Sequence, residues 1–286
     1  PTPIVALATS RGATWVIWVV VVALLACLVG VPLLNLTIQL GRQVHQLPGG
    51  ELRRTWGLTH AGEMLLYSVW EFRREMIWSL GTSVVAATLA IVVATPLAWL
   101  ARGGSWRSWP LILAVAILFA LPGPLLGLLL GRLFNAPNWT WLNFLYDRSI
   151  AAPTLALALR AFPLVAIVTW YALRSVPNKL LDAAALDGAG PWEQLLWIAL
   201  PQRKLALLAA WLLGLAIALG DLAASFLVLP PGTSPLSRRI FEEVHYGVPD
   251  RVAGITLVTM LMTSTIVLVA LWLVSRELAR DRRSAW

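Results

Sequence analysis

Charged side chains are scarce in this sequence of 286 residues: Asp, Glu, Lys and Arg make up 13%, whereas hydrophobic residues make up 59%. A soluble globular domain carries about 25% charged residues, so the composition excludes a water-soluble globule. The apolar content also excludes an intrinsically disordered chain. Cysteine is almost absent, since Cys27 is the one cysteine, and this rules out an intrachain disulfide and a cysteine metal site.

Long apolar stretches are what the sequence has instead. Each is about 20 residues or more, which is enough for a helix to cross a hydrocarbon core of roughly 30 Å. They are continuous rather than alternating, so the fold class is an all-α membrane protein and not a membrane β-barrel. The predicted spans are about 15–38, 79–100, 109–130, 150–173, 205–229 and 252–275.

Two stretches have a composition that differs from that of a simple membrane span: one precedes the second span and one lies within the third. Glu63–Met76 interleaves aromatic and charged residues, which is typical of an interfacial amphipathic helix. The third span contains the sequence LPGP at 121–124, which predicts a kink that faces the helix bundle or a cavity, or that has only a packing role. We expect residues 1–14 to form a cytoplasmic N-terminal segment or linker, and residues 15–286 to form one six-span domain.

The net charge of +8 does not indicate a nucleic-acid partner. The Lys and Arg residues lie scattered in short loops between spans, where they flank a bilayer and form no single basic face. Their numbers on the two sides of the membrane are nearly equal, so the positive-inside rule does not set the orientation.

The polar stretch between the fourth and fifth predicted spans, residues 174–204, is the exception to the apolar pattern. It predicts two short helices joined by a hinge. Asn178 is the expected N-cap of the first helix, and Gly188 supplies the permissive backbone that ends it. Pro191 suits the first turn of the second helix, and Pro201 is expected to stop it.

An apolar surface is predicted on the first of these helices. Leu181, Ala184 and Ala185 fall on one side of it, where another protein's groove could accept them.

This stretch resembles the EAA loop of the permease subunits of ATP-binding cassette (ABC) importers, with the family's spacing intact. The resemblance implies a type I ABC importer permease core whose loop acts as a cytoplasmic coupling helix that docks on the ATPase. Asp182 stands where the family usually has Glu, which shortens the reach of any ion pair with the ATPase. The residues assigned to coupling are Asp182, Ala183, Ala184, Asp187, Gly188, Ile198, Leu200 and Pro201.

The resemblance also implies partners and a location. The partners are an ABC ATPase dimer, a periplasmic or lipid-anchored solute-binding protein, the lipid bilayer, and a second permease half that is identical, homologous or fused. The location is the bacterial cytoplasmic (inner) membrane, with both termini cytoplasmic. The start at Pro1 fits the second half of a fused permease.

No catalytic motif accompanies these features. The sequence has no G-x-x-x-x-G-K-[ST] phosphate loop, no H-E-x-x-H and no G-x-S-x-G. We therefore expect no catalytic residue, metal or cofactor, and ATP hydrolysis by a separate subunit. Two other classes stay open: an ATP-independent secondary transporter, which leaves residues 174–204 unexplained, and an intramembrane enzyme, whose catalytic residues should cluster at one depth.

Two charges fall inside predicted spans, Arg160 in the fourth and Asp221 in the fifth. Counted from the outer ends of those spans, both lie roughly 12 to 15 Å deep. A charge at such depth usually pairs, faces the bundle interior or lines a pathway. The sequence predicts either an Arg160–Asp221 ion pair that holds two helices in register or a place in the translocation pathway.

The solute is predicted from a second resemblance. Gly220–Gly254 and Leu159–Leu164 resemble ferric iron importer permeases, whereas permeases for thiamine, polyamines, sulfate and phosphonates share the fold. Solute would arrive from the binding protein at the outer loops, with Ser234–Asp250 and Glu63–Met76 as candidate receiving segments. Four charged residues there are either receptor contacts or a solvated face: Arg238, Arg239, Glu242 and Glu243.

Overall fold

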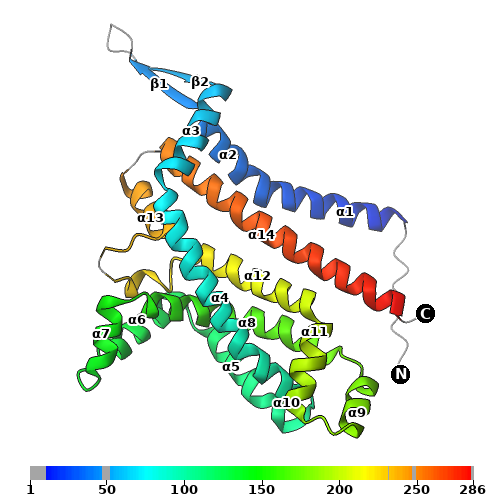
Figure 1. Cartoon of the computed structure of the whole chain (residues 1–286). Helices are drawn as coiled ribbons and strands as arrows, with labels where there is room; N and C mark the ends of the chain where they lie inside the picture. Colours follow the sequence, from blue (N-terminus) through cyan, green and yellow to red (C-terminus); the bar gives the residue numbers. More distant parts are fainter. Residues whose placement is uncertain (1–10, 47–51, 231, 247–248, 285–286) are drawn as a thin grey trace. The chain divides into compact units, whose positions relative to one another are not determined.

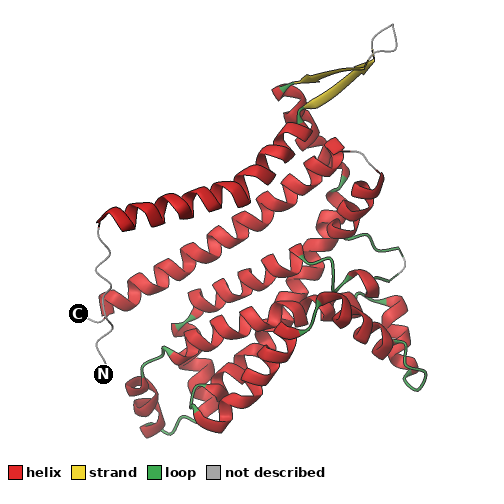
Figure 2. Ribbon diagram, turned by 180° about the vertical axis from the view of Figure 1, so that it is seen from behind, coloured by secondary structure: helices red, strands yellow, loops and turns green. Residues whose placement is uncertain are grey.

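Helices form nearly all of the computed structural model, which describes residues 11–46, 52–230, 232–246 and 249–284 (Figure 2). Contacts divide this part of the chain into two compact units. The first unit contains the described residues up to Trp70 together with Glu243–Val258. The second contains Glu71–Glu242 together with the described residues from Thr259 onward.

The first unit begins with one long apolar helix. It consists of α1 (Arg11–Leu25), a π-helical turn (Ala26–Gly30) and α2 (Val31–Leu40). Most of its apolar side chains are exposed, as expected for a surface that faces lipid. Leu40 at its end packs with Ala61 of α3 (Leu58–Glu71) and Ala253 of α14 (Pro249–Ser284).

A β-hairpin follows α2 as a small addition to the predicted helical fold. Strands β1 (Arg42–Gln46) and β2 (Leu52–Trp56) pair antiparallel, with Arg42 opposite Trp56. A strand of five residues gives too short an alternation to stand out beside long apolar runs, so the sequence did not reveal it.

The core of the second unit is a close packing of α4 (Arg73–Ala101), α8 (Ala151–Arg174) and α12 (Lys204–Gly220). Small residues let these backbones approach, as in other membrane helix bundles. A Cβ at Gly214 of α12 would lie 2.7 Å from Val165 Cγ2 of α8, so only glycine fits there. Many of the buried residues in these helices are alanines: Ala86, Ala87, Ala90, Ala94 and Ala98 in α4, and Ala161 and Ala166 in α8.

The predicted amphipathic helix Glu63–Met76 is divided between two helices. The chain breaks at Phe72, whose φ of −96° and ψ of 18° lie outside the helical region, and α4 begins at Arg73. Phe72 is buried, which fixes the break.

The third predicted span is two helices and not one kinked helix. After the 3₁₀ turn η2 (Ser105–Ser108), the chain forms α5 (Trp109–Ala120) and α6 (Gly123–Phe134) and bends by 106° between them. Leu121 is extended, because the residue before a proline disfavours the helical region. The helix α7 (Thr140–Arg148) follows α6.

The fifth predicted span, 205–229, is too long. Helix α12 ends at Gly220, and the chain continues irregularly through a 3₁₀ turn, η4 (Phe226–Val228), to α13 (Leu236–Tyr246). The sequence pattern does not predict that α12 ends at Gly220. A continuous apolar run has the same pattern whether it forms a helix or a buried irregular segment.

The described residues contain four helices that are long and apolar enough to cross a membrane, or up to six if each of two bent pairs counts as one span. The four are Thr14–Leu40, Arg73–Ala101, Ala151–Arg174 and Pro249–Arg280, and the pairs are Trp106–Ala120 with Gly123–Phe134 and Pro191–Gln202 with Lys204–Gly220. In the second unit, α9 and α10 lie at one end of α4, α8 and α12, whereas α6 and α7 lie at the other (Figure 1).

Candidate functional site

Residues 174–204 fold as two short helical pieces joined by a hinge. The first is α9 (Asn178–Leu186), and the second runs from α10 (Pro191–Glu193) through a π-helical turn (Gln194–Ala199) to α11 (Leu200–Gln202). Gly188 between them has a φ of 91°, a conformation that L side chains rarely adopt.

Two predicted boundaries of this segment are wrong. The N-cap of α9 is Pro177, and Asn178 is the first helical residue; no side chain caps this end. Pro201 does not stop the second piece. It occupies the first turn of α11, where a missing N–H is tolerated, and the chain instead bends by 82° near Arg203.

The segment rests on a small apolar core. Leu181, Leu195 and Ala199 are buried against Ala98 and Leu173, at the ends of α4 and α8. Among the residues assigned to coupling, Ile198 and Leu200 pack on this core and are half-buried. Ala184 is also half-buried, whereas the other five are exposed: Asp182, Ala183, Asp187, Gly188 and Pro201.

The burial of Leu181 corrects the predicted docking surface, because its side chain fills the core and is not free to enter another protein. The exposed apolar residues are different ones. Leu186 is 90% exposed and Trp197 79% exposed, and they are joined by Leu180, Trp192 and Leu196. The sequence does contain a sign of these exposed residues, namely large apolar side chains in a stretch that is too polar to cross a membrane.

Arg102, the C-cap residue of α4, ties the segment to the helix bundle. Its guanidinium donates to the carbonyls of Leu173 (3.2 Å) and Val176 (2.7 Å) and to Asn178 Oδ1 (2.6 Å). It thus satisfies carbonyls at the C-terminal end of α8 and holds the first residue of α9. Burial lowers the pKa of the Arg102 guanidinium, and the charge of Asp182 opposes that shift.

Arg203 ties the other end of the segment. Its Nη2 donates to the carbonyl of Ser175 (2.8 Å), and its Nη1 lies 3.6 Å from Glu277 Oε1 of α14. Both side chains of this ion pair are buried. In addition, Trp99 Nε1 of α4 donates to the carbonyl of Pro191 (3.1 Å). The sequence did not predict these three anchors. The basic residues at span ends, Arg102 and Arg203 among them, were considered only as indicators of membrane topology.

The structure brings Arg160 and Asp221 together, with Arg160 Nε 3.2 Å from Asp221 Oδ2. Asp221 Oδ1 also accepts from the backbone N–H of Ala224 (2.8 Å). The depth of Asp221 was counted along a helix that reached residue 229, whereas α12 ends at Gly220 and Asp221 lies at the turn that follows. The carboxylate therefore both pairs with α8 and shapes the chain's exit from α12.

A small cavity adjoins Asp221, with polar and apolar side chains in its lining. It is lined in part by Ser79, Thr82 and Ser83 of α4 and by Asp221 and Ser225, and its volume is about 20 Å³. That volume holds about one water molecule. Ser83 Oγ is buried and makes no hydrogen bond with a described residue. In this conformation the cavity has room for water but not for a larger solute.

A protein-family model matches most of the chain. Residues 87–276 match the model described as "Binding-protein-dependent transport system inner membrane component". The chain belongs to this family. It is a multi-pass membrane permease subunit of an ABC importer, and such a subunit moves solute without itself being catalytic.

Individual relatives agree with this assignment. The permease is 24% identical over 187 residues to the putative molybdenum transport system permease protein YvgM of Bacillus subtilis, covering 62% of this chain and 82% of the relative. It is 28% identical to the molybdenum permease ModB of Haemophilus influenzae, covering 71% and 88%. It is 29% identical to the spermidine/putrescine permease PotC of Escherichia coli, covering 42% and 44%.

A solved structure shares the fold. The structure of the MetNI methionine ABC transporter aligns with a TM-score of 0.56 at 18% identity, covering 76% of this permease and 97% of the matched chain. At that identity the likeness concerns the fold alone.

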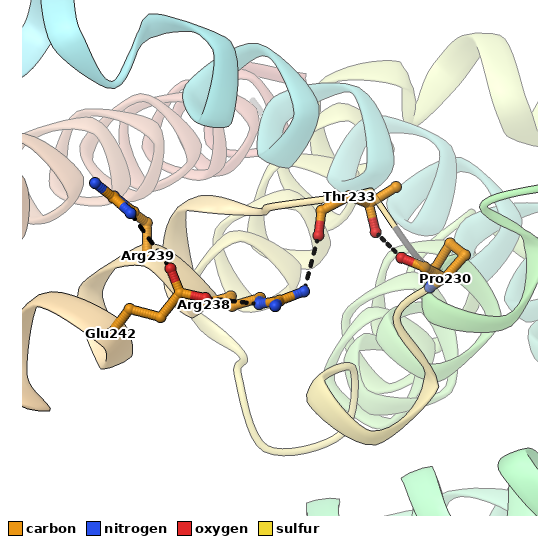
Figure 3. A network of polar contacts seen from close by, with 5 residues as sticks. All are labelled: Pro230, Thr233, Arg238, Arg239 and Glu242. Carbon is orange, nitrogen blue, oxygen red and sulfur yellow. Dashed lines mark hydrogen bonds and ion pairs between the residues drawn. The ribbon is translucent and has the colours of Figure 1, made fainter.

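The charged residues predicted as receptor contacts are largely paired within the permease (Figure 3). Glu242 accepts from Arg238 Nε (2.9 Å) and lies 3.4 Å from Arg239 Nη1. Arg238 Nη1 also donates to the carbonyl of Thr233 (3.2 Å). Glu243 is buried, which fits neither of the alternatives predicted for it, a receptor contact or a solvated face.

Proposed function

We propose that residues 174–204 couple this permease to a separate ATPase dimer in an ATP-driven importer. The observation that carries the proposal is the combination of exposed apolar side chains, called the exposed face below, with a firmly anchored base. Leu186 and Trp197 are free to enter a groove, whereas Arg102 and Arg203 fix the segment to the ends of the helices. A push on the exposed face is thereby transmitted to α4, α8, α12 and α14.

The exposed face suits a protein partner better than water. Large apolar side chains on a polar segment mark interaction sites, and aromatic anchors contribute most of the binding free energy at interfaces. Asp182 and Asp187 lie exposed on or next to α9, where they are placed to pair with basic residues of the ATPase. Closure of the ATPase dimer would then move the segment and switch the permease between outward and inward access.

The orientation follows from this role. The ATPase binds ATP in the cytoplasm, so we place residues 174–204, and with six spans both termini, on the cytoplasmic side of a bacterial inner membrane. The loop around α13 and the β1–β2 hairpin would then lie outside, where a periplasmic or lipid-anchored binding protein delivers solute. A second permease half, identical, homologous or fused, would complete the pathway.

For the solute we propose a small oxyanion of the molybdate class, because the molybdenum permeases are matched over most of their length. The polyamine permease is matched over less than half of its length. Ferric iron is the second candidate, and it rests on the resemblance of Leu159–Leu164 and Gly220–Gly254 alone.

Capture of the ATPase encoded nearest to this gene tests the coupling proposal. We expect the wild-type permease to retain the ATPase through purification and Leu186→Ala to retain much less. Leu58→Ala is the matched control, since Leu58 is also a highly exposed leucine but lies on α3. Equal capture by all three proteins would contradict the proposal.

Uptake into proteoliposomes that contain the complete transporter identifies the solute. Molybdate, ferric iron and spermidine are each presented with the cognate binding protein. ATP-dependent accumulation of molybdate alone supports the first candidate, and accumulation of iron alone replaces it with the second. Uptake without ATP would favour a secondary transporter instead.

A further inference from the structure

A groove of about 530 Å³ lies between α5 and α8, at the end of the second unit that carries α9. This volume is within the range of ligand-binding sites. Its walls are apolar: α5 contributes Leu111, Ile112, Val115 and Ala116, and α8 contributes Ile167 and Trp170.

The end of the groove differs from its walls. Arg174, the last residue of α8, is exposed there, and its guanidinium lies 5.0 Å from the centre of the Trp170 ring. Arg107 is exposed in η2, next to Ser108, which lines the groove. Neither arginine forms an ion pair with a described residue. The open end is therefore basic.

Exposed tryptophans lie near the basic end of the groove and indicate its depth in the membrane. Trp106, in the same turn as Arg107, is 73% exposed, and Trp109, which follows that turn, is 58% exposed. Tryptophan is enriched where membrane proteins meet lipid headgroups. The basic end of the groove thus lies at headgroup level, and its apolar walls extend toward the hydrocarbon.

We propose that this groove binds an anionic phospholipid, with an acyl chain along α5 and α8 and the phosphate at Arg174 and Arg107. Guanidinium groups bind phosphate oxygens through two parallel hydrogen bonds. Basic pockets between helices on the cytoplasmic side attract anionic headgroups. That the lipid belongs to the cytoplasmic leaflet rests on the orientation in the proposed function; the groove itself does not.

The groove is continuous with residues 174–204, because Arg174 is the first of these residues. Trp170 also packs on the small apolar core that supports them. A lipid bound there holds the end of α8 from which the segment departs. The charge of the surrounding lipid is therefore expected to regulate coupling as well as to anchor the permease.

Native mass spectrometry of the purified permease, with the subunits that accompany it, tests the proposal. Phosphatidylglycerol and phosphatidylcholine are titrated separately. For Arg107→Gln/Arg174→Gln we expect about tenfold weaker binding of phosphatidylglycerol, as for loss of charge-assisted hydrogen bonds to its phosphate. The loss should be smaller for phosphatidylcholine, because its choline group already neutralises the phosphate charge. Ala116→Phe fills the groove and should remove both lipids.

Two matched variants serve as controls. Arg132→Gln removes an exposed arginine of α6 that does not line the groove, and Ala120→Phe enlarges an exposed alanine one turn beyond Ala116. Both should bind lipid as the wild type does.

Wild-type lipid binding by both groove variants would overturn the proposal. So would separation of the two permease halves by Ala116→Phe with lipid binding intact, because the groove would then be an interface between halves. The lipid count requires neither ATPase nor solute. A permease that binds phosphatidylglycerol but captures no ATPase would refute the proposed function and leave the lipid site standing.

Discussion

Arg203 and Glu277 form a buried ion pair that joins the end of residues 174–204 to the last helix, α14, with Arg203 Nη1 and Glu277 Oε1 3.6 Å apart. Burying two charges is costly, and a hydrophobic pair of similar size is often at least as stable. We infer that the pair is kept for position, because it makes α14 follow the movement of the segment.

Removing one partner of this pair should be strongly destabilising. For Glu277→Gln we expect a loss of about 3 kcal/mol in the free energy of unfolding, since the buried Arg203 charge loses the carboxylate with which it forms its ion pair. Chemical denaturation in detergent measures it. The double variant Arg203→Met/Glu277→Met should recover most of the stability but not ATP-driven uptake. Recovery of uptake by the double variant would contradict a positioning role.

Arg102 cannot be replaced by lysine in its clamp. Its planar group reaches two carbonyls and Asn178 Oδ1 at once, whereas a lysine ammonium is a single compact donor. We expect Arg102→Lys to lower the stability by about 2 kcal/mol and to make α9 more accessible to limited proteolysis. Arg107→Lys, at an exposed arginine nearby, should change neither quantity.

Gly188 is required for its backbone conformation. With a φ of 91° and no atom within 4 Å of a Cβ, a side chain there is strained but not crowded. We expect Gly188→Ala to cost about 1 to 2 kcal/mol and to reduce ATPase capture. Gly190→Ala is the control, because Gly190 has an ordinary φ of −69°. If the two alanine variants behave alike, the hinge does not depend on this conformation.

Asp221 has two functions that substitutions can separate. Asp221→Asn keeps an acceptor for the N–H of Ala224 but removes the charge that pairs with Arg160. If pairing is what transport needs, Asp221→Asn and Arg160→Leu should impair uptake alike. The swap Arg160→Asp/Asp221→Arg should restore only part of it, because it loses the cap on Ala224. Wild-type uptake by Asp221→Asn would show that the charge is dispensable.

The sequence predicted the helical membrane class and the two helical pieces with a hinge in residues 174–204, because both depend on local signals. Apolar runs of span length are visible without tertiary context, and Gly188 and Pro191 act on their own backbone. Helix ends were harder to predict from the sequence. The ends at Phe72 and Gly220 depend on burial and on the Asp221 side chain, which an apolar profile does not contain.

The contacts that anchor residues 174–204 could not be predicted for a related reason. Arg102 and Arg203 contact carbonyls and a carboxylate more than 70 residues away in the sequence, or on another helix. The same limit affected Leu181, whose pattern suggested an exposed face although its partners, Ala98 and Leu173, lie on other helices. Only the packing shows which side of α9 faces inward.

The most direct test of the central claim is uptake by proteoliposomes that contain the permease, its ATPase and its binding protein, comparing the wild type with Gly188→Trp. Coupling through residues 174–204 predicts uptake that requires ATP and is lost in Gly188→Trp, although the variant inserts and folds. Uptake that is independent of ATP, or that is unchanged in Gly188→Trp, would contradict it.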